Sequence, residues 1–256
     1  MTVSALTIAK PHAAMILAAG LGVRMRPLTD ITPKPLLKLS GRPLLDHAFD
    51  RLLAVGVRDV VVNAHWLGEQ IADHLAARHA TGIPPQTRLM HEVTLLDTGG
   101  SVRAALALPD KQLGPEPFYV INGDAYWVDG PRPALARMAA AFDDSVDGVL
   151  LVHRGFQVRA DVGFGDFTVD KLGRPRRRAE RQVVPYIFAG VQLISPALLD
   201  DMPPAPFSMN LAWDRAIERG RLRVVVHDGL WFHLSTPNDL RDTEHFLHAP
   251  AYGEMR

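Results

Sequence analysis

The sequence contains no cysteine among its 256 residues. This absence excludes disulfide bonds, thiol catalysis and cysteine-ligated metals. Neither sign of charge is in excess, because 28 Lys and Arg residues balance 28 Asp and Glu residues. A chain without net charge has no general attraction to nucleic acid or to an anionic membrane, so we expect neither as a partner. Any anion that the protein binds must therefore be held by a local site.

Long apolar runs are missing as well. No stretch approaches the roughly 20 residues needed to cross a bilayer, and residues 1–12 lack an apolar segment of signal-peptide length. We therefore expect a cytoplasmic protein. No polar stretch is long enough to be an interdomain linker, so we expect one domain over residues 1–256, as a monomer or a small homo-oligomer.

The first half of the chain alternates between strand and helix patterns. Strands are predicted at 13–19, 57–63, 88–91 and 118–122, and helices at 43–55, 67–77 and 100–108. Such alternation is typical of a mainly parallel sheet with helices on both faces. From residue 148 onward the pattern favours shorter strands near 149–153, 164–169, 186–194 and 223–226, with one helix near 211–219 and loops at 109–117, 174–182 and 203–207. We expect an α/β fold of three layers, with a nucleotide-binding half at 13–147 and a β-rich half at 148–245.

A glycine-rich segment follows the first predicted strand. It reads LAAGLGVRMRPLT over 17–29, and PKPL follows at 33–36. Four small residues let the backbone approach a ligand, so that N–H groups can face phosphate oxygens: Ala18, Ala19, Gly20 and Gly22. Arg24 and Lys34 bring positive charge to the same place. The spacing fits neither a Walker A loop nor the dinucleotide fingerprint, and for the two glycines alone a tight turn without a ligand is the alternative.

With its flanking residues this segment resembles the signature of the sugar nucleotidyltransferases. The resemblance covers nearly the whole chain, through NAHWLGEQIADHL (63–75), DTGGSV (97–102), INGDAYW (121–127), GFGDF (163–167), PYIFAGVQLISP (185–196) and LWFHLSTPNDL (230–240). These segments look most like the N-acetylmuramate alpha-1-phosphate uridylyltransferases of bacterial cell-wall recycling, and next like the mannose-1-phosphate guanylyltransferases. The resemblance implies a Rossmann-like nucleotidyltransferase fold and transfer of a nucleoside monophosphate, with UTP favoured, to a sugar-1-phosphate.

An acidic residue, Asp124, lies just beyond the strand predicted at 118–122, where open α/β sheets bind their ligands. We interpret it as a Mg²⁺ ligand, because Mg²⁺ takes one or two protein carboxylates and completes its shell with phosphate oxygens and water. A turn aspartate is the alternative. The family usually has a second metal carboxylate where this chain has His233. Imidazole suits Mn²⁺ or another transition metal better than Mg²⁺, so His233 is either a ligand or a neighbour of the metal.

The resemblance also implies roles for other residues. Arg24 would neutralise the leaving phosphates, and Lys34 would bridge the α-phosphate and the incoming phosphate. Glu92 would accept a hydrogen bond from a base N–H, with Gly99 and Gly100 admitting the base. For Glu92 a solvated strand end is the alternative.

On the sugar side, the resemblance places Gly165, Gly190 and Asn210 over the acceptor. Many members hold the sugar phosphate with a Glu-Lys pair, and the nearest match to it in this sequence is Glu180 with Arg181. A solvated basic loop is the alternative there. Because that pair and one metal carboxylate are not matched, a catalytically idle, nucleotide-binding regulatory protein is the second hypothesis.

Overall fold

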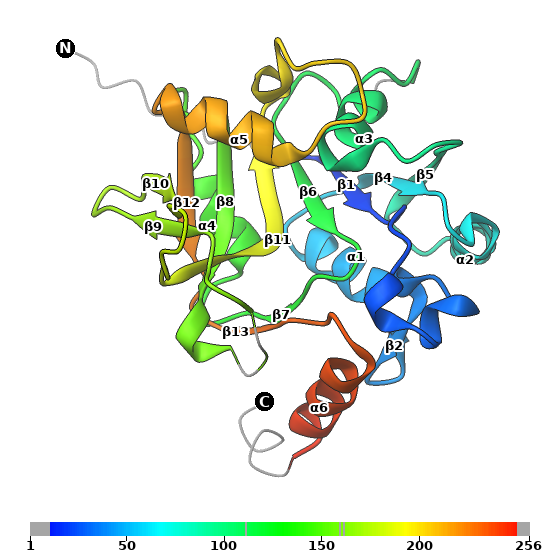
Figure 1. Ribbon diagram of the computed structural model, residues 1–256. Coiled ribbons are helices and arrows are strands. Elements are labelled where there is room, and N and C mark those ends of the chain that lie inside the picture. Colours follow the sequence, from blue (N-terminus) through cyan, green and yellow to red (C-terminus); the bar gives the residue numbers. More distant parts are fainter. Residues whose placement is uncertain (1–10, 111, 159, 161, 250–256) are drawn as a thin grey trace.

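A computed structural model describes residues 11–110, 112–158, 160 and 162–249. One mixed sheet of nine strands lies at its centre (Figure 1). Four of its strands are β1 (Ala13–Leu17), β4 (Asp59–Ala64), β5 (Gln86–His91) and β6 (Phe118–Asn122). They are parallel and lie in the spatial order β6, β1, β4, β5. The four strands predicted in the first half of the chain are thus confirmed.

Five further strands complete the sheet. They are β8 (Gly148–Arg154), β9 (Phe167–Val169), β10 (Pro175–Arg177), β11 (Tyr186–Ile194) and β12 (Leu222–Val226). β11 runs antiparallel between β6 and β8, and β12 lies parallel to β8. The loop predicted at 174–182 is wrong at β10. That short edge strand carries a proline and two arginines, so it lacks the apolar alternation on which a strand prediction depends.

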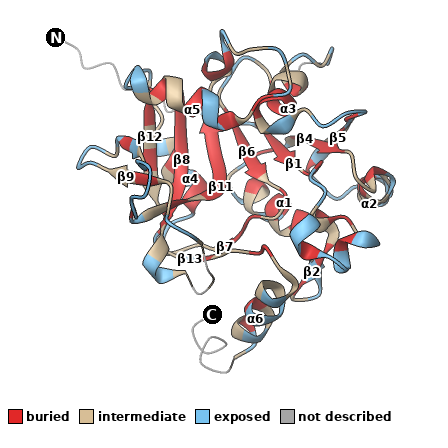
Figure 2. Ribbon diagram, viewed as in Figure 1, coloured by how far each residue is buried: buried red, intermediate tan, exposed pale blue. Residues whose placement is uncertain are grey.

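Helices cover both faces of the sheet, which confirms the three predicted layers. They are α1 (Leu44–Ala54), α2 (Gly68–Ala80), α3 (Asp97–Leu106), α4 (Ala134–Ala140) and α5 (Met209–Glu218). Side chains alternate along β1, so Ala14 and Ile16 join the core with α1, α2 and α4, whereas Ala13 and Met15 join the core with α3 and α5. Because both faces are covered, the central strands are buried along most of their length (Figure 2).

A helix that the apolar pattern does not predict, α6 (Pro237–Leu247), follows the last strand. Two small antiparallel pairs lie near it: β7 (Tyr126–Val128) with β13 (Leu230–Phe232), and β2 (Lys38–Leu39) with β3 (Arg42–Pro43). The start of α6 is fixed by a capping box, in which the side chains of Thr236 and Asp239 each accept a hydrogen bond from the other residue's backbone N–H. Across the described residues, no helix combines the length and the apolar character that a membrane span requires.

The start of α3 is packed tightly against the segment that leads into α5. The backbone N–H groups of Gly99 and Gly100 both donate to the carbonyl of Phe207, at 2.9 and 3.0 Å. A Cβ on Gly99 would lie 2.3 Å from Cε2 of the buried Phe207 ring. The contact with Phe207 is therefore the reason for a glycine here. The backbone dihedrals do not require one, since Gly99 lies in a helix.

We predict that Gly99→Ala lowers the free energy of unfolding by about 1–3 kcal/mol, because the added methyl group forces the Phe207 ring to move. Urea unfolding followed by circular dichroism measures the effect. Gly20→Ala is the matched control, because a Cβ at Gly20 meets nothing within 4 Å. Equal stability of the two variants would contradict the assignment.

Candidate active site

A cavity of about 550 Å³ opens at the carboxyl ends of β1, β4 and β6. Its wall includes the four small residues predicted to approach a phosphate: Ala18, Ala19, Gly20 and Gly22. Gly22 has a φ of +62°, and its carbonyl accepts a hydrogen bond from Thr29 Oγ1 at 2.8 Å. Gly20 has open space where a side chain would be. Gly22 is thus needed for the turn itself, whereas Gly20 leaves room for a ligand.

The three charged side chains predicted to act on phosphates meet in this cavity. Arg24, Lys34 and Asp124 all line it. Lys34 Nζ lies 2.5 Å from Asp124 Oδ2, and the side chains are 12% and 39% exposed. Among the residues that the structure describes, Arg24 has no carboxylate within ion-pair distance. The cavity therefore holds one paired and one unpaired cation, which is an arrangement that can receive polyanionic ligands.

Two backbone segments bring these side chains together. Lys34 begins a single 3₁₀ turn, Lys34–Leu36, that follows the glycine-rich segment. Asp124 follows β6, where the N–H of Gly123 donates to the carbonyl of Leu17 at 2.8 Å. That bond ties the end of β6 to the end of β1, so the carboxylate and the glycine-rich loop are held at the same edge of the sheet.

A buried chain of hydrogen bonds supports the loop from below. Asn63, at the end of β4, accepts from the backbone N–H of Ala18 at 2.7 Å and donates to Glu92 Oε1 at 2.7 Å. Ser101 Oγ also donates to Glu92 Oε1, at 2.6 Å, and the N–H of Leu96 donates to Oε2 at 3.1 Å. Sequence reasoning missed Asn63 and Ser101. A polar residue ending an otherwise apolar strand was the available signal for Asn63.

The structure places Glu92 in the cavity wall at 3% exposure, so the alternative of a solvated strand end is wrong. Its carboxylate already accepts three hydrogen bonds from the protein. Gly99 and Gly100 do not line the cavity, and their N–H groups are bonded to Phe207. The close approach that this pair permits in the structure is that of the chain before α5, and their role beside the base stays a prediction.

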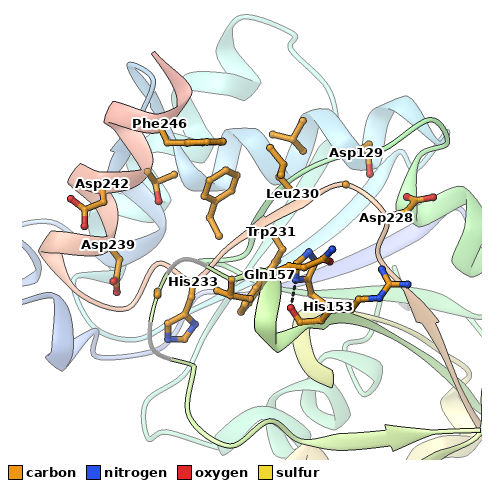
Figure 3. Close-up of a pocket in the computed structure, with 17 residues that line it drawn as sticks. Asp129, His153, Gln157, Asp228, Leu230, Trp231, His233, Asp239, Asp242 and Phe246 are labelled. Atoms are coloured by element: carbon orange, nitrogen blue, oxygen red, sulfur yellow. Dashed lines mark hydrogen bonds between the residues drawn. The ribbon is translucent and has the colours of Figure 1, made fainter. Parts of the chain in front are cut away.

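His233 lies beside a second, larger cavity of about 960 Å³, together with Trp231, His153 and residues of α6 (Figure 3). Burial lowers the pKa of His233; Asp239 acts against this shift, and Arg24 and Lys34 reinforce it. The ring is therefore neutral at neutral pH, as a metal ligand must be. Within the described part of the chain, no three His, Asp or Glu side chains are grouped so as to hold a metal.

The residues predicted for the sugar side lie outside the linings of both cavities. Gly165 and Gly190 have φ of +77° and +79°, and a Cβ would lie 2.2 Å from the Val184 carbonyl oxygen and 3.0 Å from Ala125 Cβ, respectively. Asn210 Oδ1 accepts from Arg177 at 2.8 Å. The side chain of Arg181 is 92% exposed. None of the four lines either cavity, and their assignment to the acceptor remains a prediction.

Residues 14–207 match the MobA-like NTP transferase domain. The chain belongs to this family. It is accordingly a nucleotidyltransferase with the three-layer fold of sugar-1-phosphate nucleotidyltransferases. It is similar to the N-acetylmuramate alpha-1-phosphate uridylyltransferases of Caulobacter vibrioides, at 37% identity over 89% of this chain and 93% of that protein, and of Neisseria meningitidis, at 32% over 90% and 96%.

More distant similarity extends to other sugar-1-phosphate nucleotidyltransferases. The mannose-1-phosphate guanylyltransferase catalytic subunit beta of Drosophila melanogaster is 28% identical over 88% of this chain and 60% of its own length. A solved structure of a putative glucose-1-phosphate thymidylyltransferase from Bacillus anthracis superposes with a TM-score of 0.74 at 18% identity, covering 91% of this chain and 94% of that one. The latter similarity supports the fold.

The hydrogen bonds around Glu92 lead to a stability prediction. We expect Glu92→Gln to lower the free energy of unfolding by about 1–3 kcal/mol, because an amide nitrogen replaces one acceptor oxygen and leaves a buried donor without a partner. Thermal and urea unfolding measure the change. The control is Glu180→Gln, since the Glu180 side chain is 91% exposed. If both variants unfold like the parent, the buried chain of hydrogen bonds does not support the loop.

Proposed function

We propose that the protein transfers uridine monophosphate from UTP to N-acetylmuramate alpha-1-phosphate and releases pyrophosphate. The observation that carries this proposal is the meeting of Arg24, Lys34 and Asp124 in one cavity at the carboxyl end of a parallel sheet. The choice of base and sugar rests on the two relatives at 37% and 32% identity. A mannose-1-phosphate guanylyltransferase is the second candidate, supported by the relatives at 28%.

The reaction is an in-line displacement at phosphorus. A phosphate oxygen of the sugar-1-phosphate forms a bond to the α-phosphorus of UTP, while the bond from that phosphorus to the bridging oxygen of pyrophosphate breaks. The electron pair of the broken bond leaves with pyrophosphate. Because both reactants are anions, positioning and charge neutralisation supply most of the rate enhancement. No covalent intermediate on the protein is required.

Each cation in the cavity has a distinct part in this scheme. Arg24, which is unpaired among the described residues, neutralises the departing β- and γ-phosphates. Lys34 is held in place by Asp124 before substrate arrives, and its three N–H donors then bridge the α-phosphate and the incoming phosphate. Gly20 lets backbone N–H groups approach the same oxygens.

A divalent ion fits the donors that are present. Asp124 turns a partly exposed carboxylate toward the cavity, and a single carboxylate with phosphate oxygens and waters satisfies Mg²⁺. Neutral His233 offers a nitrogen donor that suits Mn²⁺ better. When bound, such an ion would supply positive charge to the phosphates, in addition to that of Arg24 and Lys34.

Pyrophosphate release tests the proposal. We expect UTP with N-acetylmuramate alpha-1-phosphate to give the highest kcat/KM in a panel of four NTPs and several sugar-1-phosphates. Lys34→Ala or Arg24→Ala should lower that value by roughly 10²–10³-fold, because each removes a preorganised charge from the transition state. Lys38→Ala and Arg26→Ala are matched controls, since both residues are exposed and lie outside the cavity.

The outcomes separate the candidate functions. GTP with mannose-1-phosphate as the best pair would favour the guanylyltransferase. Nucleotide binding without pyrophosphate from any acceptor would favour the regulatory protein. Near-parental turnover by folded Lys34→Ala and Arg24→Ala would exclude the roles assigned to these side chains.

Metal preference tests the proposed part of His233. We expect His233→Asp to shift the preference toward Mg²⁺, because a hard carboxylate replaces a softer nitrogen donor. The measurement is kcat/KM at a series of Mg²⁺ and Mn²⁺ concentrations. His248→Asp serves as the control, since His248 lies at the C-terminal end of α6 and its side chain is 64% exposed. Superimposable titrations for His233→Asp and the parent would show that His233 is not a ligand.

A further inference from the structure

The cavity has a carboxylate at its wall that the proposed mechanism does not use. Asp97 lines the cavity at the start of α3 and is exposed. Among the described residues, no Lys or Arg lies within ion-pair distance of it. An unpaired negative charge repels phosphate, so the polyphosphate of a nucleotide must lie away from Asp97 and toward Arg24 and Lys34. The opposite end of the nucleotide, its base, then lies near Asp97.

The sheet topology agrees with this orientation. Asp124 follows β6, whereas Asp97 lies in the segment that follows β5, and β1 and β4 separate those two strands. At about 4.8 Å between neighbouring strands, the ends of β5 and β6 are on the order of 14 Å apart. The cavity wall beside Asp97 also contains the apolar side chains of Leu95 and Pro206. This part of the cavity suits a flat, uncharged ring better than a phosphate.

The orientation of the Asp97 carboxylate is fixed by its own backbone. Asp97 has a φ of +58°, a conformation that glycine adopts more readily than aspartate. Of the non-glycine residues with positive φ in the described chain, Asp97 alone lines this cavity. Its Oδ1 accepts from the N–H of Thr98 at 2.6 Å. This bond leaves Oδ2 to accept from a ligand.

The neighbouring polar groups are already committed to the protein. Glu92 accepts three hydrogen bonds, and the N–H groups of Gly99 and Gly100 donate to Phe207. Among the described residues at this end of the cavity, the carboxylate of Asp97 is therefore the charged group that can still accept a hydrogen bond from a ligand. Beside it, the hydroxyl oxygen of Thr98 accepts from the N–H of Met209 at 2.9 Å, which leaves its own hydrogen to donate.

We propose that Asp97, rather than Glu92, reads the base by accepting a hydrogen bond from a ring N–H. Uracil presents such a donor at N3 beside a carbonyl oxygen that can accept from Thr98. Cytosine has an unprotonated ring nitrogen at the same place, whose lone pair faces the carboxylate. The inference rests on the proposed function, which it deepens by assigning selection of UTP over CTP to one side chain.

Binding without acceptor tests this assignment, because no turnover occurs without a sugar phosphate. Isothermal titration gives Kd for UTP and for CTP. We expect the parent to bind UTP at least 10-fold more tightly than CTP, which is the discrimination that one hydrogen bond to a charged group provides. Asp97→Asn should bring the two constants within about 3-fold, because the amide can donate as well as accept.

Two further variants make the result specific. Asp97→Gly removes the carboxylate and accepts the positive φ without strain, so it carries the test if Asp97→Asn does not fold. Asp201→Asn is the matched control, because Asp201 is exposed, has a φ of +60° and lies outside the cavity. We expect Asp97→Gly to lose the discrimination and Asp201→Asn to keep it.

The inference is overturned if the parent binds UTP and CTP equally or binds neither. It is equally overturned if Asp97→Asn or Asp97→Gly keeps the parental ratio of dissociation constants. Failure of the proposed function looks different: discrimination between the free nucleotides is intact, but no sugar-1-phosphate yields pyrophosphate.

Discussion

The site depends on the side-chain amide of Asn63, which joins the ends of three neighbouring parallel strands. Its oxygen fixes the backbone of Ala18 after β1, and its nitrogen holds Glu92 after β5. Both bonds are buried, and together they define which way the amide faces. A buried polar chain of this kind is stabilising only when every member has a partner. Because Ser101 and Leu96 complete the bonding of Glu92, the loops around the cavity form one rigid wall.

Rigidity of this wall matters because the cavity holds two like charges, Arg24 and Lys34, which repel each other. Lys34 is held close to Asp124, so the cavity keeps a compensated pair until phosphate arrives. Arg24 has no such partner among the described residues and is exposed. In the proposed reaction, preorganised charges of this kind act without moving, which is what makes them more effective than water. By holding the backbone of Ala18, the buried amide of Asn63 thus helps to position the loop that faces the phosphates in the proposed reaction.

The sequence was informative where a local pattern and the topology agree. An apolar run that ends in glycines predicted β1 and its loop, and the parallel order of strands predicted that Asp124 would approach that loop. Contacts made only by folding were not predictable. Glu92 is bonded to Asn63, which lies 29 residues away in the sequence. A side chain at Gly99 would clash with Phe207, which is also distant in the sequence. Such roles have no signature in spacing or composition.

Three residues predicted on the acceptor side have a part in the fold itself. Gly165 and Gly190 have positive φ in a tightly packed backbone, and Asn210 is bonded to Arg177. Their assignment to the acceptor came from the resemblance alone and stays a prediction. The segment after β13, in contrast, lines both cavities. His233 lines the larger cavity and Ser235 lines the smaller one, with buried Leu234 between them.

That three-residue segment is therefore the shared wall of the two cavities. Asp239 holds its end, since its carboxylate accepts from the N–H groups of Ser235 and Thr236 at 3.0 and 2.7 Å. The capping box of α6 consequently positions the wall as well as starting the helix. Asp239 lines the larger cavity with His233, whereas Arg24, Lys34 and Asp124 line the smaller one, and all four act on the pKa of His233. The charges of both cavities therefore act on this one ring.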